Sequence, residues 1–494
     1  MSDETTKPST GAEIGATTDV TTETTAETGT PLNTQGHDPA VPEAYAAFMR
    51  TGWGDRDLDL PRHPVSDWAR ARRERLAAQF PGERLVIPSG TFKVRANDTD
   101  YRFRSDTAHT HLTGNQTSDA VLVIEADGSA TLFARPRSSR ETDEFFRDRQ
   151  YGELWAGRRP SLTEISSSLG LPTRHIDELA DTLSVSAKTR VLRGVDRRVD
   201  ALVAADEGRD AELERVLSEL RLVKDEWELG ELARACDITT LGFEDCVRDW
   251  DRVLEYGERW IEGTFFRRAR AMGNDIGYDS IVGGGRHATT LHWIDNTGPI
   301  VPGELVLLDM GAEASSLYTA DVTRTLPISG SFTSLQRDLY DIVLRAQQAG
   351  IDAVRPGTDF KSAHNAAMSV IAHALDDMGL LPVSAEEALD PDNRTYARWT
   401  LHGTSHMLGM DVHDCADASK DIYPEGTLEP GMVLTVEPGL YFQEDDLLVP
   451  EELRGTGIRI EDDIVVTEDG NRNLSEALPR GVDAIEEWMG RLRG

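Results

Sequence analysis

The sequence predicts an α+β fold in which an N-terminal α/β domain precedes a larger α+β domain. In the first half, short apolar runs typical of strands alternate with charged stretches of helical period. In the second half, the strand-like runs do not alternate one by one with helices, which favours antiparallel pairing over a βαβ repeat. The chain has 494 residues, and at roughly 100–200 residues each two or three domains are expected.

We expect three segments. Residues 1–38 are rich in Thr and poor in large apolar residues, so they cannot bury enough surface to offset the entropy of ordering, and a disordered tail is predicted. Residues 39–214 are predicted to form the N-terminal α/β domain. Residues 215–494 are predicted to form the second domain.

The elements of the first half follow from periodicity and turn chemistry. A helix is expected over 67–79. The stretch 120–135 predicts a β-hairpin, because its two apolar runs flank an Asp-Gly pair that tolerates the positive φ of a tight turn. The stretch 210–255 is long, charged and helical in period, and we place the domain boundary near its start.

In the second half, helices are expected over 333–354 and 359–378. Apolar runs predict the strands of this domain: ELVLLDMGA, VLTVEPGLYF and IRIEDDIVVT.

Composition excludes several classes of partner. The chain has 52 basic and 87 acidic side chains and a net charge of −35, so it has no basic excess to displace counterions from nucleic acid. No run reaches the ~18 apolar residues of a membrane helix, and no signal peptide is recognisable. We therefore expect no nucleic acid, no membrane and a cytoplasmic location. Cys236, Cys246 and Cys415 are expected to be free thiols.

Carboxylates and histidines concentrate beside the strand-like runs of the second half. The acids are Asp309, Asp321, Glu437 and Glu461, and His406 accompanies them. A carboxylate in an apolar strand is costly unless it is paired or metal-bound. One such acid is usually a strand-end residue that faces solvent, but four in one domain beside histidines predict a metal site.

If these side chains converge, the four carboxylates carry −4 and two divalent ions carry +4. Without the ions, the carboxylates would repel one another and their pKa values would rise. Oxygen-rich ligation with one imidazole suits Mn²⁺ or a similar ion better than a structural zinc site. Two such ions ionise a water and polarise a carbonyl, so hydrolysis is predicted.

Other residues near these acids are candidates for supporting roles. On a strand, Arg459 and Glu461 would face the same side, so Arg459 is predicted to orient the metal carboxylates, with a surface salt bridge as the alternative. His402 and His413 flank the ligand histidine in a Gly-containing segment, which favours function. His292 follows a Gly-rich turn, and its spacing alone leaves a functional and a structural role open.

These segments resemble the pita-bread-fold metallopeptidases, a family that includes methionine aminopeptidase, prolidase, aminopeptidase P and creatinase. The likeness is closest to the bacterial aminopeptidase P branch and covers about residues 65–490. It is carried by YRFRSDTAHTHLTG, LWAGRRPS, HGTSHMLGMDVHD, TVEPGLYF and GIRIEDDIVVT.

The resemblance implies a pita-bread catalytic domain that holds two divalent metal ions, with Mn²⁺ expected. The positions that match its metal ligands are Asp309, Asp321, His406, Glu437 and Glu461. Asp321 and Glu461 match the carboxylates that bridge the two ions. Glu437 matches the glutamate that handles the proton of a bridging hydroxide.

The resemblance also implies an activity and further catalytic residues. His292, His402 and His413 match histidines that bind the peptide, the last two also stabilising the oxyanion, and Arg459 matches an arginine beside the carboxylates. The implied reaction is attack of a metal-bridging hydroxide on the Xaa-Pro bond, which releases the N-terminal residue of peptides with proline in second position. Relatives of this type form homodimers or homotetramers, so an oligomer is expected.

Two alternatives stay open. A prolidase uses the same ligands but accepts only Xaa-Pro dipeptides, so a tripeptide substrate would separate the two activities. A non-catalytic pita-bread protein would use the shell for binding. Such relatives lose ligands, whereas all five ligand positions here keep metal-competent side chains.

Overall fold

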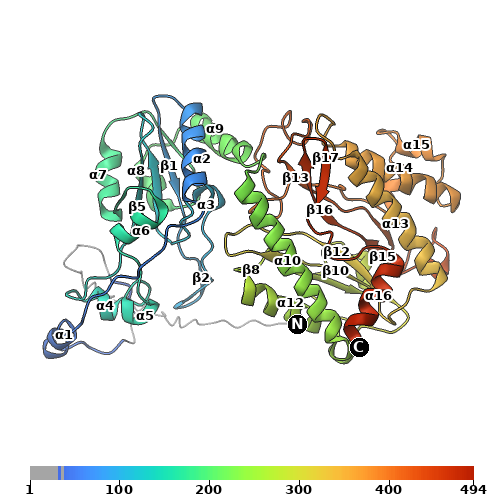
Figure 1. Ribbon diagram of the computed structural model, residues 1–494, viewed down its shortest axis with the longest axis horizontal. Coiled ribbons are helices and arrows are strands. Elements are labelled where there is room, and N and C mark those ends of the chain that lie inside the picture. Colours follow the sequence, from blue (N-terminus) through green and yellow to red (C-terminus); the bar gives the residue numbers. More distant parts are fainter. Residues whose placement is uncertain (1–31, 35–37) are drawn as a thin grey trace, which may run out of the picture.

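The computed structural model describes residues 32–34 and 38–494 of the chain, so the tail predicted over 1–38 lies almost entirely outside the described residues. Figure 1 shows two parts joined by helices: an N-terminal part around one sheet and a C-terminal part around several short sheets. No helix of the described part has both the length and the apolar composition to cross a membrane.

The N-terminal part is built on a mixed five-stranded sheet with the order β6-β5-β4-β1-β7. β4 and β5 pair antiparallel, and Gly128 in their turn has a φ of +85°, so the predicted hairpin is confirmed. β1 pairs with β7, and β5 with β6, in parallel. The strands are β1 (Arg84–Pro88), β4 (Val121–Ile124), β5 (Ala130–Ala134), β6 (Thr173–His175) and β7 (Thr189–Val191).

Helices pack on both sides of this sheet, and the helix predicted over 67–79 is confirmed as α2. The shorter elements of this part are the β2–β3 hairpin and several one- or two-turn helices. The elements are α1 (Glu43–Met49), α2 (Ser66–Gln79), β2 (Val94–Ala96), β3 (Thr99–Asp100), α3 (Thr107–Thr113), α4 (Glu144–Arg147), α5 (Glu153–Ala156), α6 (Leu162–Leu169), α7 (Leu179–Ser184) and α8 (Arg197–Leu202).

The helical stretch predicted over 210–255 is divided into three helices. They are α9 (Glu207–Leu220), α10 (Glu226–Arg248) and α11 (Trp250–Tyr256). α10 starts anew because Asp225 and Glu228 form a capping box, in which each side chain accepts from the backbone N–H of the other. The boundary expected at residue 215 falls inside α9.

The strands of the C-terminal part pair antiparallel throughout the described residues, as predicted. The helices predicted over 333–354 and 359–378 are confirmed as α13 and α14, and together with α10, α12 and α16 they surround the sheets (Figure 1). These helices are α12 (Glu258–Met272), α13 (Ser334–Ala353), α14 (Ser362–Asp377), α15 (Ala385–Leu389) and α16 (Val482–Arg493).

The strands of this part form a β12-β10-β9 sheet, a β13-β16-β17 sheet and the two-stranded β14-β15 and β11-β8 pairs. Their bounds are β8 (Asp275–Ile276), β9 (Ile281–Gly284), β10 (Leu305–Asp309), β11 (Ala312–Glu313), β12 (Thr323–Pro327), β13 (Val433–Val436), β14 (Gly439–Phe442), β15 (Thr456–Arg459), β16 (Asp462–Thr467) and β17 (Gly470–Asn473).

The continuous strand expected for IRIEDDIVVT was wrong. β15 ends at Arg459 and β16 begins at Asp462, so Glu461 lies in a break where the chain changes its partner from β14 to β13. β13 and β14 are separated by a matching break that contains Glu437. Because Val436 pairs with Asp462 on one side of the breaks, the two glutamates lie close together, outside both ladders.

Candidate metal centre

A cavity of about 460 Å³ opens at these strand breaks. Its size falls within the range of small-molecule sites. Its wall brings together every site residue predicted from the sequence: His292, Asp309, Asp321, His402, His406, His413, Glu437, Arg459 and Glu461.

The two aspartates meet because β10 and β12 pair antiparallel, with Asp309 opposite Thr323 and Asp321 two residues earlier in the chain. The hydroxyl of Tyr278 lies 2.6 Å from Oδ1 of Asp309 and 2.5 Å from Oδ1 of Asp321, so it fixes one carboxylate against the other. Sequence reasoning missed Tyr278, because one tyrosine in a glycine-rich segment has no local pattern that marks it.

His406 is placed by β13. The backbone N–H of Thr435 donates to the carbonyl of His406, and the N–H of Glu437 donates to that of Thr404, so the two segments run side by side. Nε2 of His406 thereby lies 3.3 Å from Oδ2 of Asp321 and 3.6 Å from Oε1 of Glu437.

Arg459 joins both sides of the centre. Its Nη2 donates to Oδ2 of Asp309 at 2.6 Å, and its Nη1 donates to the hydroxyl of Tyr441 at 3.0 Å. Its Nε donates to Oγ1 of Thr323, and that hydroxyl donates to Oε2 of Glu461 at 2.6 Å. A guanidinium can orient several acceptors at once because its donors have a fixed fork geometry.

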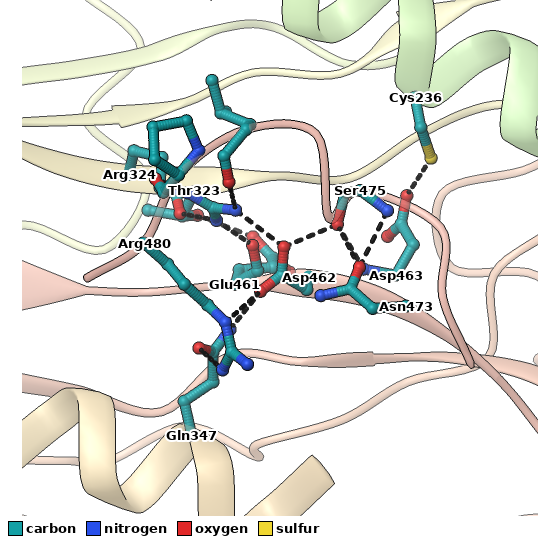
Figure 2. A network of polar contacts seen from close by, with 12 residues as sticks. Cys236, Thr323, Arg324, Gln347, Glu461, Asp462, Asp463, Asn473, Ser475 and Arg480 are labelled. Carbon is teal, nitrogen blue, oxygen red and sulfur yellow. Dashed lines mark hydrogen bonds and ion pairs between the residues drawn. The ribbon is translucent and has the colours of Figure 1, made fainter. Parts of the chain in front are cut away.

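A second polar network lies behind Glu461 (Figure 2). Arg324 is fully buried and donates to the carbonyl of Glu461 at 2.5 Å and to Oδ1 of Asp462 at 2.7 Å. Oδ2 of Asp463 accepts from the backbone N–H of Asp321 at 3.1 Å. The network therefore holds the backbone on which two of the predicted ligands are mounted. Consecutive acids before an apolar IVV run were the available sequence signal for it.

The electrostatics of the centre follow from crowding and burial. Burial raises the pKa of Asp309 and of Glu461, and it raises that of Glu437 to about 7. Burial would also raise the pKa of Asp321, but the hydrogen bond and the charge of His406 lower it. Burial opposes the imidazolium, yet Asp321 and Glu437 raise the pKa of His406 to about 9.

The donor set fits divalent cations. Asp321, His406 and Glu461 each offer one ligand atom, and these atoms lie within 4.8 Å of one another. Asp309 and Glu437 line the same cavity. Carboxylates with a single imidazole suit hard or borderline ions, and their mutual repulsion is relieved when a cation binds.

The other histidines differ in how they are fixed. Nδ1 of His402 lies 2.8 Å from the carbonyl of Gly403, so it carries the hydrogen, and Nε2 accepts from the hydroxyl of Tyr441 at 2.8 Å. Burial and the charge of Arg459 lower the pKa of His402 to about 4, so this ring is neutral. The ring of His413 lies edge-on to His406 at 4.4 Å between centroids. Across the described part of the chain, no hydrogen bond reaches the ring nitrogens of His413.

Sequence comparisons cover both parts of the chain. The profile of metallopeptidase family M24 matches residues 230–468, and that of the aminopeptidase P N-terminal domain matches residues 69–192. Xaa-Pro aminopeptidase 1 of Streptomyces coelicolor is 54% identical over 465 residues, which cover 92% of this chain and 94% of the relative. Xaa-Pro aminopeptidase 2 of the same organism is 54% identical over 463 residues, covering 92% and 98%.

Solved structures of aminopeptidase P have the same fold over most of this chain. Aminopeptidase P from Escherichia coli with the inhibitor Pro-Leu has a TM-score of 0.77 and 29% identity, over 87% of this chain and 99% of that chain. Aminopeptidase PepP of Pseudomonas aeruginosa has a TM-score of 0.77 and 30% identity, over 88% and 100%.

Proposed function

The chain belongs to metallopeptidase family M24, in its aminopeptidase P branch, and from that premise we propose how its own residues carry out the reaction. It is a metal-dependent exopeptidase that removes the N-terminal residue before proline. The predicted enzyme class and the predicted fold, an N-terminal α/β domain followed by a pita-bread domain, are thereby confirmed. The relatives that are 54% identical are Xaa-Pro aminopeptidases, which favours this activity over the prolidase alternative.

The observation that carries the site assignment is that the five predicted ligands, four carboxylates and the imidazole of His406, line one cavity together. The side chains that would hold two divalent ions are Asp309, Asp321, His406, Glu437 and Glu461. Mn²⁺ is the proposed metal, because the ligand set is rich in oxygen and contains one imidazole. When bound, the ions ionise a water and polarise the scissile carbonyl.

Glu437 is the proposed proton carrier. It takes the proton of the attacking water and gives it to the proline nitrogen as the C–N bond breaks, which yields the free first residue and a peptide that begins with proline. Nδ1 of His402 lies 3.6 Å from Oε2 of Glu437, so the carrier has a polar neighbour on its outer side.

The histidines have separate proposed tasks. His413 has no hydrogen-bond partner among the described side chains and can donate to the oxygen on which charge develops. His402 is held through Tyr441 against Arg459, so it keeps a fixed neutral tautomer beside the peptide. His292 lies on a wall with Leu291 and other apolar residues, which suits contact with the proline ring.

Three further points belong to the proposal. The two domains, predicted over 39–214 and 215–494 after the tail, are proposed to divide close to residue 215, where the break between α9 and α10 is the nearest helix end. A homodimer or homotetramer would cover aromatic side chains of the N-terminal part, where Phe48 is 75% and Trp155 is 53% exposed. A cytoplasmic location is supported by the three cysteines, which are buried and unpaired.

The test is hydrolysis of Ala-Pro-Ala by the chelator-treated full-length chain, with and without added Mn²⁺. We expect release of alanine only with metal, and we expect Glu461→Gln to lose this activity together with bound metal. Glu444→Gln is the matched control, because Glu444 is exposed and lies outside the cavity. Activity that survives complete metal removal, or a fully active Glu461→Gln, would contradict the assignment.

A further inference from the structure

The N-terminal domain touches the loop that carries His413 through Arg104, in the segment YRFRSDTAHTHLTG. Nη2 of Arg104 donates to the carbonyl of Met410 at 2.9 Å and lies 3.1 Å from Oδ1 of Asp411. Its Nε donates to Oε2 of Glu313 at 2.6 Å. One side chain of the first domain thus bonds to three residues of the catalytic domain.

Thr107 reinforces this contact. Its hydroxyl donates to Oδ1 of Asp411 at 2.8 Å and accepts from Nη1 of Arg104 at 3.2 Å. Thr107 is the first residue of α3, whose start is fixed by Asp106, the side chain of which accepts from the backbone N–H of His109. Asp411 is therefore held from a capped helix end rather than from a free loop.

The receiving segment, residues 409–414, is named here the His413 loop. Its far end is fixed as well: Oδ1 of Asp414 accepts from Nε of Arg221 at 2.9 Å, and Oδ2 accepts from the backbone N–H of Met410 at 3.1 Å. The loop closes so tightly that a Cβ on Gly409 would lie 2.1 Å from the Asp414 carboxylate. Both ends are thus held, and His413 lies between them, exposed toward the cavity.

The imidazole of His413 depends on this backbone for its position. His402 has a partner for each ring nitrogen, whereas those of His413 have none among the residues that the structure describes. A shift of the loop would therefore move the His413 ring directly. A misplacement of about 1 Å at a catalytic group can cost on the order of 100-fold in rate.

We propose that Arg104 is a positioning residue through which the N-terminal domain holds His413 at the catalytic cavity. The proposal rests on the catalytic role proposed above for His413. It gives the first domain a part in the reaction besides any part in assembly. The rival explanation is that Arg104 only joins the two domains.

Arg102 offers a matched control, because it lies two residues away in the same segment and crosses the same seam. It pairs with Asp275, which is outside the His413 loop. Arg104→Ala removes the contacts with the His413 loop, and Arg104→Lys keeps the positive charge but not the planar guanidinium. Arg102→Ala removes an ion pair between the two domains that does not involve the His413 loop. If Arg104 merely joined the domains, the two alanine variants would have similar effects.

The experiment measures kcat and KM for Ala-Pro-Ala with the full-length, Mn²⁺-loaded proteins, together with metal content and Tm. We expect Arg104→Ala to lower kcat by about 10-fold at unchanged metal content, with partial recovery in Arg104→Lys. Arg102→Ala should stay within about two-fold, as for an exposed ion pair. Equal losses in the two alanine variants would overturn the proposal.

A double-mutant cycle with His413→Ala then tests the route. If Arg104 acts through His413, adding Arg104→Ala to His413→Ala should lower kcat by less than about two-fold, whereas independent action would repeat the full loss of kcat and overturn the proposal.

Should Arg104→Ala fail to fold, Thr107→Val takes its place in the same cycle, since it removes one hydrogen bond to Asp411 without removing a charge. Absence of cleavage by the wild type would count against the proposed function, whereas a normal wild type with additive losses counts against this inference alone.

Discussion

The buried pair of Arg324 and Asp462 permits a quantitative prediction about the substitution Arg324→Met. Arg324 is fully buried and donates to Asp462 and to the carbonyls of Glu461, Leu478 and Pro479. Removal of one partner from a buried ion pair costs about 3–5 kcal/mol, because the other charge is left behind. The lost carbonyl contacts would each add about 1 kcal/mol.

Part of that cost is avoided because Asp462 keeps two other donors. Ser475 donates to its Oδ1 at 2.6 Å and Gln347 donates to its Oδ2 at 2.8 Å. We therefore take the low end of the combined range, about 6 kcal/mol. At roughly 2–4 °C per kcal/mol for a domain of this size, Tm should fall by about 12–24 °C.

The assay is thermal unfolding of the metal-free protein, followed by circular dichroism, so that metal affinity does not enter the comparison. Asp462→Asn added to Arg324→Met removes a buried charge whose remaining cationic partner, Arg480, lies 3.9 Å away, and it should restore about half of the loss. Arg337→Met is the control: Arg337 pairs with Asp483 and Glu486 at the surface, and such pairs contribute about 0–1 kcal/mol each. A fall of less than about 3 °C in Arg324→Met, or no recovery in the double variant, would refute the reasoning.

Three other predictions concern the metal centre. In the metal-free protein the pKa of Glu437 is raised to about 7 and that of Asp309 is raised too, so protons compete with metal below neutral pH. The apparent metal affinity should therefore rise from pH 6 to pH 8. Calorimetry in buffers of different ionisation enthalpy should show the release of protons on metal binding. Glu437→Ala should abolish turnover in the tripeptide assay, since it removes a ligand and the proton carrier together, and near-normal activity with metal still bound would contradict the assignment. Tyr278→Phe removes the hydroxyl between Asp309 and Asp321 and should weaken metal binding by about 10-fold in a chelator competition. The Tm of the metal-free protein should change little. An unaltered metal affinity would show that this hydroxyl does not orient the ligands.

The sequence predicted most of the acids and histidines that line this cavity, but not the residues that hold them in place, such as Tyr278 and Arg324. Asp309 and Glu437 could be proposed as ligands because Asp309 ends the apolar strand β10 and Glu437 follows the apolar strand β13, where an unpaired carboxylate is costly. The hairpin at 120–135 was also predicted correctly, because it depends on turn residues that are neighbours in the sequence.

The break before Asp462 could not be predicted, because the apolar pattern continues through Ile460 without a Gly or Pro to mark it. The break follows from tertiary pairing: the chain leaves β14 and joins β13 at that point. Tyr278 and Arg324 were missed for a related reason, since their partners lie 31 to 155 residues away in the chain. Propensity and periodicity describe neighbours along the chain, not such distant contacts.

Arg324 and Arg104 act on the cavity in the same physical way from opposite parts of the chain. Arg324 donates to the backbone carbonyl of Glu461 and to the carboxylate of Asp462. Arg104 donates to the backbone carbonyl of Met410, in the His413 loop, and pairs with the carboxylate of Asp411. A lysine could satisfy one of these acceptors but not both at fixed angles, because its ammonium is a compact charge on a flexible stem. Substitution by lysine should therefore preserve charge and much of the stability at Arg104, yet lose part of the rate. That separation of rate from stability is what distinguishes a positioning arginine from one that only joins two segments.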